Sequence, residues 1–257
     1  MNLRSAWTAL IARAETRLLL GLLAVTSGVG LFAKLASEVR EGETGAFDRM
    51  VLLAFRTPGR LDTPVGPRWL QESARDITAL GGFTVLTLIS LLAVALLLVH
   101  RRRRQAVVFA ASVIIAELLS AGLKHWAGRT RPDLVPHLDL VYSNSFPSGH
   151  SMMSPVVYLT LAGVLAAGER LRAEKVLIIG GAALLAAVIG VSRVYLGVHW
   201  PTDVLGGWIL GLVIALAATW ALGVAGGAAK GRAAPASAYS ELEGERAPST
   251  ASGAPPP

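Results

Sequence analysis

The sequence predicts an all-α integral-membrane protein, a bundle of six transmembrane helices. The first observation behind this prediction is composition: the 257 residues are 53% hydrophobic and 16% charged, with a mean hydropathy of +0.54. Soluble domains carry about 25% charged residues, so this chain is poor in charge. The second observation is that the apolar residues gather in runs close to the ~20 residues that a helix needs to cross a bilayer.

Six apolar runs account for the predicted spans. They lie at 18–36, 79–99, 105–123, 151–167, 176–191 and 204–225. Arginines precede the first run, as in a signal peptide, but the small-residue sites near it fit a cleavage pattern poorly, so we expect an uncleaved span. The runs define a predicted membrane domain over 1–225. The segment 226–257 is rich in Ala, Gly, Ser and Pro without apolar periodicity, which predicts a disordered cytoplasmic tail.

The basic residues between the spans predict the orientation. Four arginines at 101–104 separate the second and third spans with no acid among them, and Arg170, Arg172 and Lys175 follow the fourth span. The positive-inside rule places these loops and both termini in the cytoplasm of a multi-pass protein of the cell (inner) membrane. The first outer loop, 37–78, carries six arginines that count against this orientation, and the unopposed tetrad decides it.

The first outer loop also contains an amphipathic stretch, 47–55. One interpretation is a helix that lies on the membrane surface and covers the site, as interfacial helices do. The other is a packed loop helix with no direct role. The sequence leaves both open.

Several classes of function are excluded by composition. The net charge of +7 could suggest a nucleic-acid partner, but no basic stripe is interleaved with aromatic residues, so we expect none. The absence of cysteine excludes disulfides, thiolate metal sites and phosphatases with a cysteine nucleophile. No GxxxxGK[ST] pattern occurs, so a P-loop is also excluded.

Three polar clusters interrupt the apolar chain. They are Lys124 with Arg131-Pro132, then Pro147-Ser148-Gly149-His150, then Ser192-Arg193 with His199 and Asp203. The clusters fall at the ends of the third to sixth predicted spans. Two spans and a short turn separate the second cluster from the third, so all three must reach the same face of the membrane. With the orientation above, that face is extracytoplasmic.

The clusters have a common chemical meaning. Two guanidinium groups and one ammonium, without a matching set of carboxylates, form a receptor for a multiply charged oxyanion. Ser148 and Gly149 precede an apolar helical run, so a hydroxyl and backbone N–H groups can point at the same anion. Two histidines supply a candidate nucleophile and a candidate acid. Asp203 can orient His199 if a helix begins near Pro201.

These clusters resemble the three motifs of the type 2 phosphatidic acid phosphatase family, whose fold and phosphate site are shared with vanadium haloperoxidases. The motifs read KxxxxxxRP, PSGH and SRxxxxxHxxxD, and residues 124–203 match every defining position in order. The resemblance implies that His199 attacks phosphorus and becomes phosphohistidine, that Asp203 orients it, and that His150 protonates the leaving oxygen. It also implies a set of phosphate-binding residues, Lys124, Arg131, Ser148, Gly149, Ser192 and Arg193. No cofactor is expected, and a cationic pocket would repel a divalent metal.

The resemblance implies a membrane lipid phosphatase that acts on a phosphomonoester or a pyrophosphate. Its expected substrates are undecaprenyl diphosphate, phosphatidylglycerol phosphate or phosphatidic acid, and the sequence does not choose among them or give the oligomeric state. A lipid phosphotransferase on the same scaffold is an alternative. A vanadate-dependent haloperoxidase is a lesser alternative, because that branch would be soluble. A transporter or lipid-binding protein is the least favoured.

Other polar and aromatic residues receive structural interpretations. Arg129 is predicted to be an interfacial anchor. Trp126, Trp200 and Trp208 lie near span ends and are interpreted as an aromatic belt. Glu117, midway along the third span, is interpreted as a hydrogen-bond partner for a neighbouring helix, with tuning of the basic residues of the site as the alternative.

Overall fold

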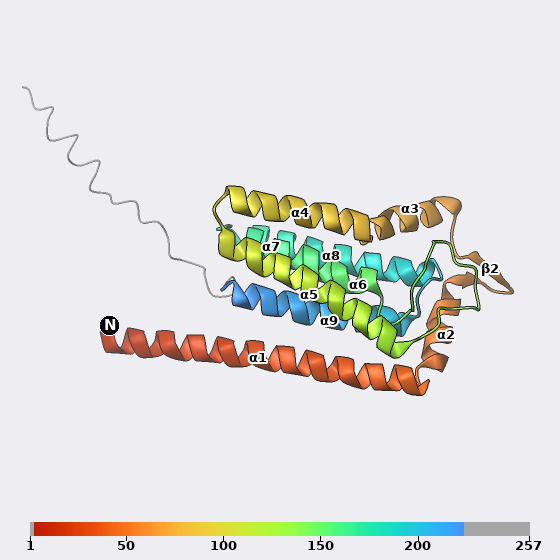
Figure 1. The fold of residues 1–257 in the computed structure, drawn as a ribbon, viewed down its shortest axis with the longest axis horizontal. Helices are drawn as coiled ribbons and strands as arrows, with labels where there is room; N and C mark the ends of the chain where they lie inside the picture. Colours follow the sequence, from red (N-terminus) through yellow and green to blue (C-terminus); the bar gives the residue numbers. More distant parts are fainter. Residues whose placement is uncertain (1–2, 224–257) are drawn as a thin grey trace, which may run out of the picture. The chain divides into compact units, whose positions relative to one another are not determined.

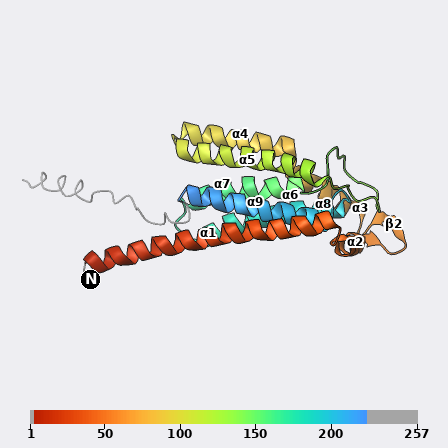
Figure 2. The ribbon, with the colours of Figure 1, turned by 60° about the horizontal axis from the view of Figure 1, so that its bottom comes forward.

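The computed structural model describes residues 3–223, with the side chains of residues 15, 16 and 18–223. The predicted tail, 226–257, lies outside the described residues. The long helices are α1 (Leu3–Glu41), α4 (Phe83–Val99), α5 (Arg103–Ala127), α8 (Arg172–Tyr195) and α9 (Pro201–Ala221). A further span is assembled from α6 (Gly149–Ser154), a π-helical turn η1 (Pro155–Leu159) and α7 (Thr160–Ala166). These helices run along one another, with α1 beside α9 and α4 beside α5 (Figures 1 and 2).

Five helices of the described chain are long and apolar enough to cross a membrane. The number becomes six if α3 (Arg68–Ala79) and α4 form one span, bent by 43°. The predicted all-α membrane bundle is therefore confirmed, and the second predicted span is the one that the structure breaks.

The break between α3 and α4 falls at two glycines, Gly81 and Gly82. The helix was predicted to run unbroken over 79–99, but α3 ends at Ala79 and α4 begins at Phe83. A Cβ atom on Gly81 would lie 3.0 Å from the Ser154 Oγ and 3.3 Å from the His150 Cδ2. Only glycine permits this approach, so the bend brings the chain against the start of α6.

Small residues also bring α9 against α6. A Cβ atom on Gly207 would lie 2.7 Å from the backbone oxygen of Ser148 and 2.9 Å from the Ser151 Cβ. Close helix contacts of this kind are common in membrane bundles, where van der Waals packing drives association. The contact sets the beginnings of α6 and α9 side by side. Buried Phe146, which stacks on Phe32 with a centroid distance of 5.7 Å, packs beneath them.

Much of the segment 37–78, which the sequence predicts to be the first outer loop, folds into short elements at one end of the bundle (Figure 1). They are α2 (Gly45–Ala54), an antiparallel hairpin of β1 (Arg56–Thr57) and β2 (Arg60–Pro64), and α3. The hairpin was not part of the all-α prediction. Asp48 and Leu52 of α2 are fully buried while Phe47 and Met50 are exposed, so α2 is packed against the protein rather than lying free on a membrane surface.

Candidate active site

The three predicted clusters meet at the bundle end that carries α2 and β2 (Figure 2). Lys124 lies near the end of α5, Gly149 begins α6, Arg193 lies near the end of α8, and Asp203 lies in the first turn of α9. The connection 128–148 runs over this end and supplies Arg131. Four helix ends and one loop therefore build the site.

His199 occupies the turn between α8 and α9 and is 2% exposed. Its Nδ1 lies 3.3 Å from the Asp203 Oδ2 and 3.3 Å from the Ser145 Oγ, and its Nε2 lies 3.1 Å from the Arg131 Nη1. We assign the proton to Nδ1, which faces the carboxylate, so that Nε2 keeps its lone pair. Burial, followed by the charges of Arg131 and Arg193, holds the pKa of His199 well below its usual range. The imidazole is therefore neutral at physiological pH.

Asp203 is fully buried and held from several sides. Its Oδ2 accepts hydrogen bonds from the Ser145 hydroxyl and, at 2.8 Å, from the backbone N–H of Trp200. The second bond is half of a capping box, with Asp203 at the third position of α9, and Pro201 begins this helix as the sequence predicted. The residue that faces the imidazole therefore also closes the start of the helix.

Arg129 is not the interfacial anchor that the sequence suggested. Its side chain is 15% exposed, and its Nη1 donates to the Asp203 Oδ1 at 2.6 Å. Its Nη2 donates to the Asp48 Oδ2 at 2.5 Å. That prediction was wrong because an arginine near a span end looks the same whether it points to lipid headgroups or inward. Nothing in the sequence linked it to Asp48, 81 residues away.

Arg131 and Lys124 are positioned by the loop that crosses the site. Arg131 donates from Nε to the backbone oxygen of Ser143 at 2.8 Å and from Nη1 to the backbone oxygen of Val198 at 2.7 Å. Burial, followed by the charge of Arg193, lowers the pKa of Arg131 to about 10, so it remains a cation. The Lys124 ammonium donates to the backbone oxygen of Asn144 at 2.9 Å. An ammonium has three donors, so it can also contact an anion.

Arg193 carries an unsatisfied donor. It is 2% exposed, and its Nη1 donates to the Thr78 Oγ1 at 3.1 Å and to the Asp139 Oδ2 at 2.5 Å. Its Nε is buried and has no hydrogen-bond partner. Burial alone would raise the pKa of Asp139, but the hydrogen bond and charge of Arg193 outweigh it and lower the pKa. A buried N–H without a partner is costly, and an oxyanion would satisfy it.

Ser148 and Gly149 form the start of α6. The Ser148 Oγ accepts from the backbone N–H and the hydroxyl of Ser151 at 3.4 and 3.0 Å, so the Ser148 proton remains available to a ligand. A Cβ atom on Gly149 would have its nearest neighbour, the Ser120 Oγ, at 3.8 Å. Protein packing therefore does not require glycine here, whereas close approach of an anion to the backbone would.

Ser192 is placed differently from the other predicted phosphate ligands. It is buried in α8, and its hydroxyl donates to the Ile189 oxygen at 2.6 Å. The Ser192 hydroxyl proton is therefore engaged in a hydrogen bond within α8. In this conformation Ser192 has no hydroxyl proton to donate to a phosphate.

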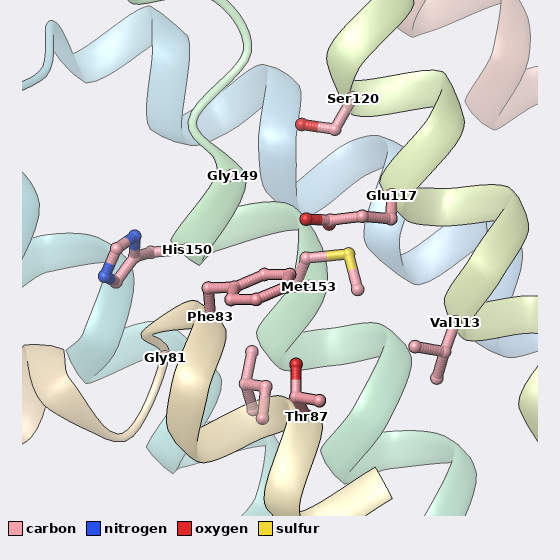
Figure 3. A pocket seen from close by; sticks show the side chains of 10 residues that line it. Gly81, Phe83, Thr87, Val113, Glu117, Ser120, Gly149, His150 and Met153 are labelled. Carbon is pink, nitrogen blue, oxygen red and sulfur yellow. The ribbon is translucent and has the colours of Figure 1, made fainter. Parts of the chain in front are cut away.

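His150 borders a cavity of about 160 Å³ between α4, α5 and α6 (Figure 3). Apolar side chains, including Phe83, Val113 and Met153, line most of it. Figure 3 shows Glu117 extending from α5 across this space toward α6. Within residues 3–223 the Glu117 carboxylate makes no hydrogen bond or ion pair, so its predicted bond to a neighbouring helix is wrong.

The three tryptophans interpreted as an aromatic belt differ in their contacts with the protein. Trp200 donates to the Thr130 oxygen and Trp208 to the Ala186 oxygen, each at 3.1 Å, and both are half-buried. Trp126 is exposed and lies under Arg40. The aromatic belt stays a prediction for all three.

Comparison with known proteins identifies the family. Residues 105–225 match the family model of the PAP2 superfamily. The crystal structure of a transmembrane PAP2-type phosphatidylglycerolphosphate phosphatase from Bacillus subtilis superposes with a TM-score of 0.69 at 31% identity, over 76% of this chain and 94% of that one. The chain belongs to the PAP2 superfamily. It is accordingly a multi-pass membrane protein, and the family resemblance read from the motifs is confirmed.

Two curated relatives each match part of this PAP2 protein. Phosphatidylglycerophosphatase B of Bacillus subtilis (strain 168) is 46% identical over 101 residues, which are 38% of this chain and 48% of that protein. An undecaprenyl-diphosphatase of Sulfolobus acidocaldarius is 40% identical over 67 residues, which are 26% of this chain and 28% of that protein. The matches thus span about half of the first relative's length and less of the second's.

Proposed function

We propose that this chain is a membrane lipid phosphatase that hydrolyses a phosphomonoester or pyrophosphate through a phosphohistidine on His199. The observation that carries the proposal is the environment of this imidazole: its Nδ1 faces a buried carboxylate and its Nε2 faces cations. The buried Nε of Arg193, which has no hydrogen-bond partner, supports an oxyanion as the ligand of this site. The names of the relatives support the same class of reaction.

The proposed reaction has two steps. In the first, the His199 Nε2 bonds to phosphorus while the bond between phosphorus and the lipid oxygen breaks, and protonated His150 gives its proton to that oxygen. In the second, water attacks phosphorus and neutral His150 takes a proton from it. The P–N bond then breaks, which releases phosphate and restores His199.

The cations would bind the phosphate without a metal. Lys124, Arg131 and Arg193 would neutralise the oxygens that gain charge in the transition state, helped by Ser148 and the backbone at Gly149. Fixed cations at these positions supply the stabilisation that Mg²⁺ gives in other phosphatases, and they would repel such an ion.

The site would face the periplasm or the cell exterior. The arginines at 101–104 lie at the turn between α4 and α5, at the opposite end of α5 from Lys124. The positive-inside rule places that turn in the cytoplasm, which supports an outward-facing site. The lipid would then reach His150 from the bilayer, beside the apolar cavity between α4 and α5.

The test is phosphate release by the purified protein from phosphatidylglycerol phosphate, undecaprenyl diphosphate and phosphatidic acid. The first two are suggested by the names of relatives. We expect turnover of at least one lipid, retained in EDTA and inhibited by vanadate, because a phosphate-shaped oxyanion would occupy the cationic site. Transfer of phosphate to a second lipid without release would favour the phosphotransferase. Loss of turnover in EDTA, restored by Mg²⁺, would overturn the metal-free assignment.

A further inference from the structure

The side chain of Arg129 lies between two buried carboxylates. Asp48 comes from α2 and Asp203 from α9, and both are fully buried. One guanidinium nitrogen donates to each, at 2.5 and 2.6 Å. The guanidinium also lies 5.7 Å from the ring centroid of Trp200, within the range of a cation–π contact.

On the Nδ1 side of His199, leaving out Arg131 at Nε2, the charges of Asp48, Arg129 and Asp203 are balanced when His199 is positive. Asp48 and Asp203 contribute two negative charges and Arg129 one positive charge, so one negative charge remains while the imidazole is neutral. An imidazole with phosphorus on Nε2 and hydrogen on Nδ1 carries one positive charge. These four side chains are therefore together neutral in the phosphohistidine intermediate, while the phosphate offsets the cations at Nε2, and buried charges are least costly when they are paired.

We propose that Asp48 and Arg129 are positioning residues for phosphoryl transfer, acting on His199 through Asp203. Arg129 holds one oxygen of Asp203 so that the other faces the His199 Nδ1. Asp48 shares the charge of Arg129, which leaves Asp203 negative enough to stabilise the phosphorylated ring. In this way α2, in the first outer loop, becomes part of the machinery. This inference rests on the proposed function.

A purely structural role for Asp48 is the alternative that must be separated. Its Oδ1 accepts from the backbone N–H of Thr202 at 2.9 Å, and its carboxylate accepts from the Thr202 hydroxyl, so it also caps the start of α9. Asparagine keeps an oxygen for that N–H but loses the charge. Asp48→Asn therefore tests the charge while retaining the cap.

The experiment measures single-turnover phosphorylation of the enzyme, together with vanadate affinity. We expect Asp48→Asn to slow phosphorylation about 10–100-fold, by analogy with the loss of an outer partner of a metal-bound histidine. Arg129→Ala should reduce the rate of phosphorylation further, since two buried carboxylates would then face each other. The phosphorylation rate of Arg129→Lys should lie between those of Arg129→Ala and wild type, because one ammonium cannot bridge both acids as a guanidinium fork does. Vanadate affinity should change less than about threefold in Asp48→Asn, because the phosphate-binding cations are untouched.

Two exposed residues provide matched controls. Asp62→Asn removes a carboxylate from the same outer loop, and Arg40→Lys changes an arginine that also lies over a tryptophan, at 5.1 Å. Both should phosphorylate at the wild-type rate. Added guanidinium, below denaturing concentration, should partly restore Arg129→Ala, while NaCl of equal ionic strength should not.

The outcomes separate this inference from the proposed function. If the wild-type protein forms no phosphoenzyme with any lipid, the proposed function is wrong. Active wild-type protein with an unaffected Asp48→Asn variant would end only the role of Asp48. Equal losses of vanadate binding and phosphorylation, with no rescue by guanidinium, would show that the pair is structural and overturn the inference.

Discussion

The neighbours of His199 act on its imidazole in opposite directions. Arg131, Arg193, Lys124 and His150 disfavour a positive charge on the ring, while the Asp203 carboxylate favours it. Burial adds to the first group and is the largest influence. The imidazole is therefore neutral in the free protein, as the proposed nucleophile must be. A bound phosphate dianion would offset the cations and so lower the free energy of the positive phosphorylated ring.

The lowered pKa of His199 predicts how stability depends on pH. Because the pKa is lower in the folded protein than the value of about 6.5 in the unfolded chain, the unfolded state binds more protons below pH 6.5. The stability contributed by neutral His199 is therefore present above about pH 6.5 and lost as the pH falls toward the folded-state pKa. We expect the Tm of wild type to fall relative to that of His199→Gln between pH 7 and 5. A constant difference in Tm would contradict the lowered pKa.

The two histidines should respond differently to the leaving group. His199→Ala should abolish turnover of every substrate, because no covalent step occurs without the nucleophile. His150→Ala should cost about 10²–10⁴-fold on a lipid monoester, whose alkoxide needs a proton, and far less on a nitrophenyl phosphate, whose phenolate leaves unaided. Single-turnover rates of phosphoenzyme formation are the measurement. Equal losses on both substrates in His150→Ala would refute its role as the acid.

At the scale of the helices, the site depends on how closely α6 and α9 approach. The backbone N–H of Ser148 donates to the backbone oxygen of Asp203 at 3.0 Å, so the second and third motifs are joined directly. Gly207 makes this approach possible, since any larger residue would meet the Ser148 oxygen. The break at Gly81 similarly leaves room for His150.

We expect Gly207→Ala to weaken both fold and activity. The added methyl would lie 2.7 Å from backbone, which cannot move aside as a flexible side chain can, and overpacking of this kind costs typically 1–3 kcal/mol. Gly180→Ala in α8 is the matched control, because nothing lies within 4 Å of its added Cβ. It should be neutral or slightly stabilising, as alanine is the better helix former. Thermal unfolding in detergent and phosphate release measure the two effects, and equal behaviour of the variants would contradict the packing argument.

At the scale of the whole molecule, catalysis and topology are linked. The described helices place the motif residues at one end of the bundle and the arginines at 101–104 at the other end of α5. With the proposed activity, a site at one end of the bundle would act in only one leaflet. The leaflet follows from the orientation of the chain.

Single introduced cysteines can test this orientation, because the chain has none of its own. Tyr142 is 92% exposed in the loop over the site, and Arg103 is exposed at the opposite end. We expect an impermeant reagent to label Tyr142→Cys but not Arg103→Cys in intact cells. Label at position 103 with protection at position 142 would place the site in the cytoplasm.

The sequence by itself determined the class of fold, the spans and the motif residues. Apolar runs near 20 residues and charged turns are local signals, set by the bilayer whatever the helices pack against. The motif residues could be named because they are adjacent in sequence or separated by fixed spacings, as His199 and Asp203 are. The hinge at Gly81 was missed because glycine inside an apolar run is compatible with a continuous helix.

Only the tertiary structure decided which polar residues face one another. Asp48 meets Arg129 across 81 residues, and Ser145 meets Asp203 across 58, so neither pair has a local signature. The same applies to Glu117, which extends into a cavity although its helix position alone suggested a partner on a neighbouring helix. The direction of a side chain depends on how its helix is rotated against its neighbours, and that rotation is set by the close contacts of small residues such as Gly207, not by the pattern along any one segment.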